Sequence, residues 1–330
     1  MILRFEIRYS AVLLDCVVAC LALLACSCSP APTPRRATPP AKTLIQLPFT
    51  AVNGANALAR VAALCALGPR DAGTPGGERA AQWLAAELQR DGLSPQVDTF
   101  TNDTPSGPLA CRNVLATAPV SYFRKCETET DCIVLLSHFD TKTGIGKDFI
   151  GANDGGSSTG LLLELARVLH DTPLRQCDVL FGFLDGEECR VQYGPRDGLH
   201  GSRRLAAQLA AGKRKVRAVI LLDMIGDRDL TVTLPVNGSK ELTLLTLQAA
   251  ETAGVRNKFA LADSHVLDDH QPFLDAGFPA VDLIDFVFGS APGLNDYWHT
   301  PADTLDKISD ASLTAVGQVV VEMLRQLDAQ

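Results

Sequence analysis

The chain has 330 residues, of which 46% are hydrophobic and 21% are charged. Such a chain can bury one large core, which excludes an intrinsically disordered protein, and a second full domain is not expected. The net charge of −8 and the absence of a Lys/Arg-rich stripe argue against a nucleic-acid partner and favour a small or peptidic one.

The N-terminal residues have the pattern of an export signal. Arg4 and Arg8 precede an apolar run over residues 11–25, which is too short for a spanning helix and indicates a cleaved signal peptide over residues 1–26. The run ends in Leu-Leu-Ala-Cys, which resembles the lipobox of bacterial lipoproteins and would make Cys26 the lipidated first residue. We expect an exported protein, tethered to the cell envelope by this lipid or otherwise periplasmic or secreted. An ordinary signal peptide or an uncleaved anchor is the alternative.

A proline-rich segment over residues 27–42 follows, and its composition predicts an extended tether to the membrane. The folded domain is expected over residues 43–330. Export permits disulfides within it, but the sequence does not define which cysteines pair. The six candidates are Cys65, Cys111, Cys126, Cys132, Cys177 and Cys189.

Apolar patterns of helical and strand type alternate along this domain. They predict helices over residues 51–67 and 77–93, strands over 96–101, 112–118 and 132–136, and a helix over 157–170. A strand over 178–184, a helix over 199–211, a strand over 217–222 and a helix over 241–252 follow. A short helix near 271–276, a strand over 280–284 and a helix over 309–327 end the chain. This order predicts a single α/β domain with a mainly parallel, mixed central sheet flanked by helices.

Metal-ligand residue types follow the predicted strands, at the sheet edge where open α/β proteins bind ligands. They are His138, Asp140, Asp154, Asp185, Glu187, Glu188, Asp223, Asp268, Asp269, His270 and His299. Each alone has an ordinary interpretation as a helix cap, a solvated acid or a structural histidine. Several anions at apolar strand ends need a compensating cation, however, and imidazole with carboxylate suits zinc.

The adjacent acids Glu187 and Glu188 predict a division of labour. One carboxylate can bind a metal while its neighbour stays free for proton transfer.

Other chemistries lack their motifs. The Gly-rich stretch 155–160 has neither the P-loop ending nor the Rossmann spacing, and no G-x-S-x-G elbow or papain-like cysteine signature occurs.

Several of these segments together resemble the zinc-exopeptidase superfamily of the M28 peptidase type, and within it the glutaminyl-peptide cyclotransferases. The resemblance covers residues 50–328 and implies the zinc-exopeptidase (phosphorylase/hydrolase-like) fold. The matching segments in chain order are 73–76, 138–140, 151–154, 183–188, 197–203, 221–226, 268–274 and 298–300.

The resemblance implies roles for individual residues. Asp154, Glu188 and His299 match the ligands of a catalytic zinc, and Glu187 matches the general acid/base. In dinuclear aminopeptidases of the superfamily, the positions of His138 and Asp223 bind a second metal that Asp154 bridges. In cyclotransferases one zinc is bound, and the position of Asp223 joins a carboxylate network.

Three features favour the cyclotransferase. Trp298 resembles that family's substrate-pocket tryptophan, Asp268 matches a catalytic network aspartate, and residues 197–203 resemble a cyclotransferase loop. Against it, Asp282 stands where animal cyclotransferases carry histidine. Ser137 and Thr159 also replace the paired cysteines of the animal enzyme, so any disulfide lies elsewhere.

Three functions are therefore open. A cyclotransferase with one zinc would convert the N-terminal Gln of peptides or proteins to pyroglutamate and release ammonia. A metallo-aminopeptidase with two zincs would hydrolyse N-terminal residues. A non-catalytic surface lipoprotein would lack the acid/base or a ligand, and this chain retains all four residues, Glu187, Asp154, Glu188 and His299.

Overall fold

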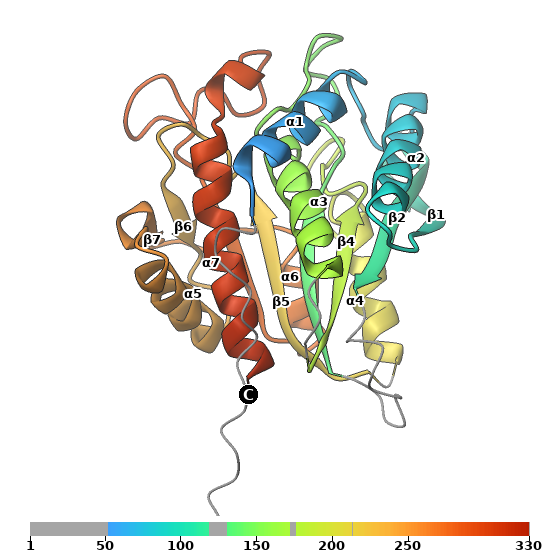
Figure 1. The fold of residues 1–330 in the computed structure, drawn as a ribbon. Helices are drawn as coiled ribbons and strands as arrows, with labels where there is room; N and C mark the ends of the chain where they lie inside the picture. The colour runs from blue at the N-terminus through green and yellow to red at the C-terminus, as the bar shows by residue number, and fades with distance from the viewer. Residues whose placement is uncertain (1–51, 119–130, 172–175, 213, 330) are drawn as a thin grey trace, which may run out of the picture. The chain divides into compact units, whose positions relative to one another are not determined.

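The computed structural model describes residues 52–118, 131–171, 176–212 and 214–329, which fall in one compact unit. Within these residues, eight strands form one mixed sheet in the order β1-β2-β4-β3-β5-β8-β6-β7 (Figure 1). The strands are β1 (Gln96–Thr104), β2 (Gly107–Ala118), β3 (Cys132–His138), β4 (Asp178–Leu184), β5 (Val216–Asp223), β6 (Val232–Leu234), β7 (Phe259–Leu261) and β8 (Ala280–Ile284). The predicted signal peptide, Cys26 and the tether lie outside the described residues.

The centre of the sheet is parallel and buried on both faces. Strands β4, β3, β5 and β8 pair in parallel, and β3 is buried along its whole length. Burial on both faces explains why these segments are continuous apolar runs rather than alternating patterns. Antiparallel pairs join β1 to β2, β2 to β4 and β6 to β8. The predicted mainly parallel, mixed sheet is confirmed.

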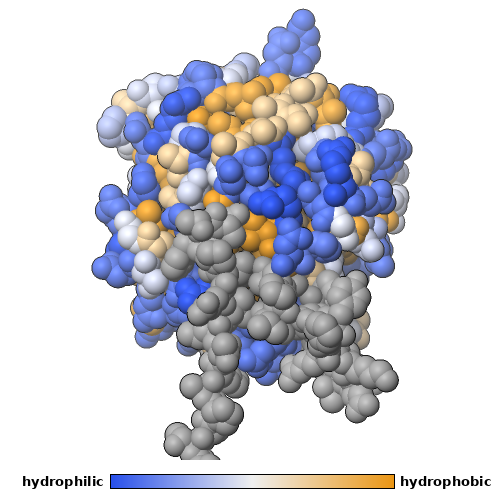
Figure 2. Space-filling model, viewed as in Figure 1, coloured by the Kyte–Doolittle hydropathy of each residue, from blue (hydrophilic) through white to orange (hydrophobic). Residues whose placement is uncertain are grey.

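Helices cover both faces of the sheet (Figure 1). One core lies between the sheet and the helices α1 (Gly54–Cys65), α2 (Pro75–Arg90), α3 (Gly156–His170), α5 (Lys240–Thr252) and α7 (Asp310–Asp328). The opposite core packs the strands against α4 (His200–Ala211) and α6 (Gln271–Asp275). This is the flanked α/β architecture that the alternating pattern predicts. Figure 2 shows an apolar area around α1 on a face that is otherwise largely hydrophilic.

Capping residues set the helix starts where the sequence pattern alone is ambiguous. The Asn53 side chain accepts hydrogen bonds from the backbone of Ala55 and Asn56, so α1 begins at Gly54 rather than at residue 51. Thr74 caps α2, and Pro75 occupies its first turn, two residues before the predicted start. Strands β6 and β7 were not predicted, because each has only three residues and too few positions to show a period.

Two further sequence questions concern cysteines and membrane helices. Among the described residues the cysteines are free and buried, so no disulfide joins them; they are Cys65, Cys111, Cys132, Cys177 and Cys189. Cys126 lies outside the described residues. In the described part of the chain, no helix has the length and apolarity needed to cross a membrane.

Candidate metal centre and active site

The candidate site forms at the carboxyl ends of the central strands. His138 is the last residue of β3, Asp223 is the last residue of β5, and Glu187 and Glu188 lie in the loop after β4. Asp154 comes from the loop that leads into α3. Because parallel strands end at the same sheet edge, residues far apart in the sequence meet there.

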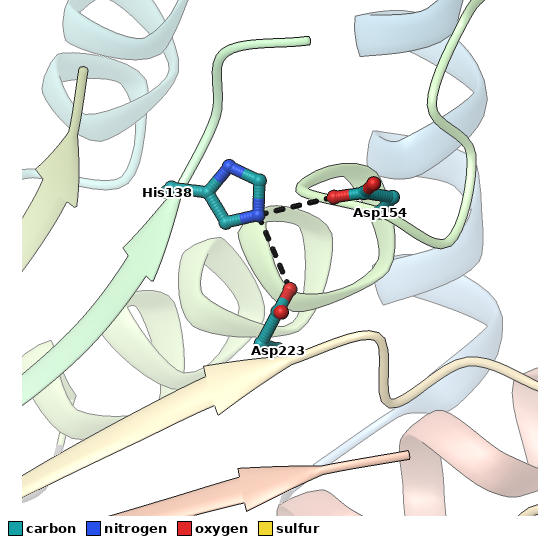
Figure 3. Close-up of side chains that lie close together, drawn as sticks. All are labelled: His138, Asp154 and Asp223. Atoms are coloured by element: carbon teal, nitrogen blue, oxygen red, sulfur yellow. Dashed lines mark hydrogen bonds and ion pairs between the residues drawn. The ribbon is translucent and has the colours of Figure 1, made fainter. Parts of the chain in front are cut away.

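One group of ligand atoms consists of His138, Asp154 and Asp223, which point toward one another (Figure 3). His138 Nε2 lies 3.3 Å from Asp154 Oδ1 and 3.2 Å from Asp223 Oδ1. All three residues are buried, and their ligand atoms lie within 4.8 Å of one another. These residues could hold a metal ion.

A second group consists of Asp154, Glu188 and His299, again within 4.8 Å. His299 Nε2 lies 2.9 Å from Glu188 Oε1 and 3.3 Å from Asp154 Oδ2. His299 has a φ of 53°, a left-handed conformation that costs a non-glycine residue about 1–2 kcal/mol. Such strain persists where the surrounding structure enforces it, which is typical of functional sites. Asp154 belongs to both groups and offers one oxygen to each.

Both groups have the electrostatics of a cation site. Burial lowers the pKa of His138, but the carboxylates of Asp223, Asp140 and Asp154 outweigh burial and raise this pKa well above its usual value. Burial likewise opposes protonation of His299, yet Asp154 and Glu188 raise its pKa to about 9. Positive charge is therefore favoured at this position, and a bound metal ion would displace the two protons.

A buried carboxylate oxygen supports the same interpretation. Asp154 Oδ2 is buried without a hydrogen bond, and His299 Nε2 lies 3.3 Å from it. Such an oxygen is costly to bury unless a cation lies beside it, which protonated His299 or a metal ion can supply. Two imidazoles and three carboxylates suit zinc, so the residues present fit the metal that the sequence predicts.

Backbone contacts from two further acids hold the ligands in position. The Asp140 carboxylate accepts hydrogen bonds from the backbone N–H groups of Glu187 and Glu188, each at 3.2 Å. The Asp303 carboxylate accepts from Asn153 at 2.7 Å and from Asp154 at 3.0 Å. These bonds fix the loops on which the ligand side chains stand.

A fully buried arginine also holds these loops through hydrogen bonds to their backbone. Arg70 donates from its guanidinium to the carbonyl oxygens of Phe139, Ile150 and Gly151, and its Nη2 lies 3.4 Å from the Asp154 carbonyl oxygen. It therefore ties the segment after β3 to the loop that carries Asp154.

Glu187 stands beside the ligands without being part of either group. Burial raises the pKa of Glu187 well above its usual value, and the Glu188 carboxylate raises it further. The Tyr193 hydroxyl donates to Glu187 Oε1 at 2.9 Å and lies 3.2 Å from Oε2. A carboxylate with a raised pKa that is held by a hydroxyl is suited to take up and return a proton.

A second set of buried carboxylates lies behind Asp223. Burial and the charge of Asp223 raise the pKa of Asp268 well above its usual value. Burial and the charge of Asp268 do the same for Asp282. Asp282 Oδ2 is 3.7 Å from His270 Nδ1, so a histidine does lie near the position where the animal cyclotransferases carry one. The network predicted for Asp223 and Asp268 is thus a set of neighbouring buried acids.

Trp298 lines the cavity that the candidate metal ligands and Glu187 also face. Its ring stacks on the His299 imidazole with a centroid distance of 4.1 Å, and Phe286 meets it edge-on at 5.4 Å. The cavity has a volume of about 730 Å³ and is lined by Asp154, Glu187, Glu188, Asp223, Asp268 and His299 together with apolar residues. This volume is typical of small-molecule sites.

Fold and site together define an α/β domain with histidine and carboxylate groups at the carboxyl edge of its sheet, facing a cavity. The chain belongs to peptidase family M28, whose sequence profile matches residues 119–324. This confirms the resemblance that the motifs indicate.

Individual relatives carry narrower names. A glutaminyl-peptide cyclotransferase-like protein from Mus musculus is 30% identical over 78% of this chain and 72% of its own length. The glutaminyl cyclase of an Acidobacteriales bacterium aligns with a TM-score of 0.76 at 34% identity, covering 84% of this chain and 95% of that one. A leucine aminopeptidase precursor from Bacteroides thetaiotaomicron aligns with a TM-score of 0.71 at 25% identity, covering 83% and 97%.

The structure places most of the predicted residues at one cavity, namely Asp154, Glu187, Glu188, Asp223, Asp268, Trp298 and His299, with His138 beside Asp154 and Asp223. Asp185 is not among them, because its carboxylate accepts a hydrogen bond from the Arg112 backbone N–H. Sequence reasoning missed Tyr193, Asp303 and Arg70. Asp303 lies four residues after His299. An acid so close in sequence to a predicted ligand was a signal that could have identified it. Tyr193 and Arg70 carry no sequence signal of this kind, because their partners are distant or lie in an irregular loop.

Proposed function

We propose that this protein is a zinc-dependent glutaminyl-peptide cyclotransferase, which closes the N-terminal Gln of peptides or proteins to pyroglutamate and releases ammonia. The observation that carries the proposal is the group Asp154, Glu188 and His299 facing one cavity with Glu187 and Trp298. The names of the mouse and Acidobacteriales relatives support the same reaction.

Each residue has a definite task in this reaction. Asp154, Glu188 and His299 would hold the zinc ion, which supplies a Lewis acid for the γ-carbonyl group when bound. Glu187 takes a proton from the α-amine as the nitrogen attacks the carbonyl carbon of the side-chain amide (Cδ), and it returns this proton to the departing amide nitrogen. One C–N bond forms, one breaks, and ammonia leaves with the transferred proton.

Neighbouring side chains orient the substrate and the base. Trp298 supplies an apolar wall for the glutamine side chain, and Asp223 with Asp268 accepts hydrogen bonds from its amide nitrogen. The Tyr193 hydroxyl holds the Glu187 carboxylate, because it contacts both oxygens. The raised pKa of Glu187 stabilises its protonated form, in which this residue carries the proton from the α-amine to the amide nitrogen.

Metallo-aminopeptidase activity is the second candidate, and the group His138, Asp154 and Asp223 favours it. If each group held a metal ion, Asp154 would supply one carboxylate oxygen to each group. Glu187 would then act as the base for a water nucleophile. Two tightly bound zinc ions per chain would support hydrolysis, and one would support cyclisation.

The deciding experiment compares two peptides with the full-length protein. Products of a Gln-initiated and a Leu-initiated peptide are weighed by mass spectrometry. Loss of ammonia from the first alone supports the cyclotransferase, whereas release of free leucine from the second replaces it with the aminopeptidase.

The Glu187→Gln variant should lose activity by about 10²–10⁴-fold while keeping its zinc content, because its shape is retained and only proton transfer is lost. An active Glu187→Gln variant would remove Glu187 from the mechanism.

We also propose that residues 1–26 direct export and that Cys26 carries the lipid, with residues 27–42 as the tether to the catalytic domain. The support is the lipobox-like sequence Leu-Leu-Ala-Cys. Labelling with a radioactive fatty acid in a bacterial host should mark the wild type and the Cys28→Ser variant but not Cys26→Ser. Label on Cys26→Ser would contradict this assignment.

A further inference from the structure

The cavity continues beyond the metal-ligand residues along a wall formed by residues 261–267. The ligands at its floor are buried or half-buried, whereas Leu261 is 63% exposed and Leu267 is 50% exposed. Both leucines line the cavity, together with Val266 and Phe286. Exposed large apolar side chains that gather beside a functional cavity mark a surface for a ligand.

This wall is held in place rather than hanging over the site. The Asn237 side chain donates to the Val266 carbonyl at 2.9 Å and accepts from the Val266 backbone N–H at 3.2 Å. The backbone N–H of Val236 donates to the Ser264 carbonyl oxygen at 3.2 Å, and that of Ala262 donates to the Leu234 carbonyl oxygen at 3.0 Å. The wall therefore exists before a ligand arrives, which lowers the entropic cost of binding.

The wall adjoins the reaction centre through aromatic contacts. Trp298 stacks on His299, Phe286 packs against Trp298, and Val266 belongs to the same apolar cluster as both aromatic residues. One peptide residue advances the chain by at most about 3.3–3.6 Å. A residue that follows an N-terminal glutamine on the floor lies one such step away, and Val266 and Phe286 form the apolar lining that adjoins Trp298 there.

The exposed wall itself carries an acidic residue. Asp263 lies on this wall, and none of the described residues that line the cavity is Lys or Arg. An acidic side chain entering here meets like charge, while an apolar one meets leucine, valine and phenylalanine.

From these contacts we propose that residues 261–267 with Phe286 form the subsite for the second residue of the substrate, selecting a large apolar side chain and rejecting an acidic one. This inference rests on the proposed cyclotransferase function. Leu261 and Leu267 are specificity-determining residues of the subsite, and they take no part in the chemical step.

The experiment measures ammonia release from three peptides that begin Gln-Leu, Gln-Ala and Gln-Asp and are otherwise identical. For the full-length wild type, kcat/KM for Gln-Leu should exceed that for Gln-Ala by about tenfold, the low end of discrimination by an apolar pocket. Gln-Asp should be the poorest of the three substrates.

The double variant Leu261→Ala/Leu267→Ala should bring the Gln-Leu to Gln-Ala ratio close to one. The loss should appear in KM for Gln-Leu with kcat unchanged, because the contact is the same in the ground and transition states. Leu244→Ala is the matched control, since Leu244 is a 51% exposed leucine on α5 outside the cavity. It should keep the wild-type ratio.

The outcomes separate the two proposals. Cyclisation of all three peptides with equal kcat/KM, or an unchanged ratio in the double variant, overturns the subsite and leaves the cyclotransferase standing. Absence of ammonia from every peptide overturns both.

Discussion

Replacing Arg70 with methionine removes a buried clamp and keeps a side chain of similar length. The guanidinium is fully buried and donates to the carbonyl oxygens of Phe139, Ile150 and Gly151. Each buried carbonyl oxygen left without a donor costs about 1–3 kcal/mol. Three such groups, with partial relaxation of the loops, predict that Arg70→Met lowers the free energy of unfolding by about 3–5 kcal/mol.

Urea unfolding of the full-length protein at a fixed zinc concentration measures this loss as a lower midpoint with an unchanged m value. Arg90→Met is the control, because the Arg90 side chain is 67% exposed and its partner Glu87 also has Arg60 at 4.0 Å. Its expected loss is about 0–1 kcal/mol. Zinc affinity should fall in Arg70→Met as well, since the clamp holds the loop that carries Asp154. If the two variants lose equal stability, the clamp has no special role and the reasoning fails.

Three further predictions concern the ligands, the loop before α3 and a buried histidine. His299→Ala should lose bound metal, and with zinc at one hundred times the wild-type Kd its free energy of unfolding should drop by about 3 kcal/mol. His265 is an exposed residue of the same cavity, so zinc binding by the control variant His265→Ala should match the wild type in titration calorimetry. Equal zinc binding by the two variants would refute the ligand role of His299. Gly155→Ala and Gly254→Ala both place alanine at positive φ, at a cost of about 1–2 kcal/mol each, but only the first puts a Cβ 2.8 Å from the His138 ring. Zinc affinity should fall only in Gly155→Ala, and parallel loss in both would argue against crowding of His138. Burial lowers the pKa of His270 from 6.5 to about 4. Below pH 6.5 the unfolded chain therefore binds a proton at His270, whereas the folded protein keeps this histidine neutral until the pH approaches 4. Between pH 6.5 and 4, urea unfolding should show wild-type stability falling more steeply than that of His270→Gln, by up to about 1.4 kcal/mol per pH unit, and equal slopes would contradict this.

The central strands and most helices were predictable because their patterns repeat over many residues. Strand β3 is a continuous apolar run, and its burial on both faces is the physical cause of that run. Strands β6 and β7 were not predictable, because three residues hold no period and their pairing depends on neighbours elsewhere in the chain. Tertiary pairing, rather than local preference, forms these two strands.

The ligand residues were predictable for a different reason. Polar residues directly after buried strands must meet at one sheet edge, so His138, Glu188 and Asp223 could be placed together before any distance was known. Arg70 could not be placed in this way. Its partners are backbone carbonyls about seventy to eighty positions away, which every residue type possesses and no sequence pattern marks.

The sharing of Asp154 between the two ligand groups makes them unequally sensitive to substitution. Asp154 Oδ1 lies 3.3 Å from His138 Nε2, and Asp154 Oδ2 lies 3.3 Å from His299 Nε2. A change at His138 or Asp223 therefore alters one group and leaves Glu188, His299 and the second oxygen of Asp154 in place. Loss of the Asp154 carboxylate would instead remove a ligand from both groups at once.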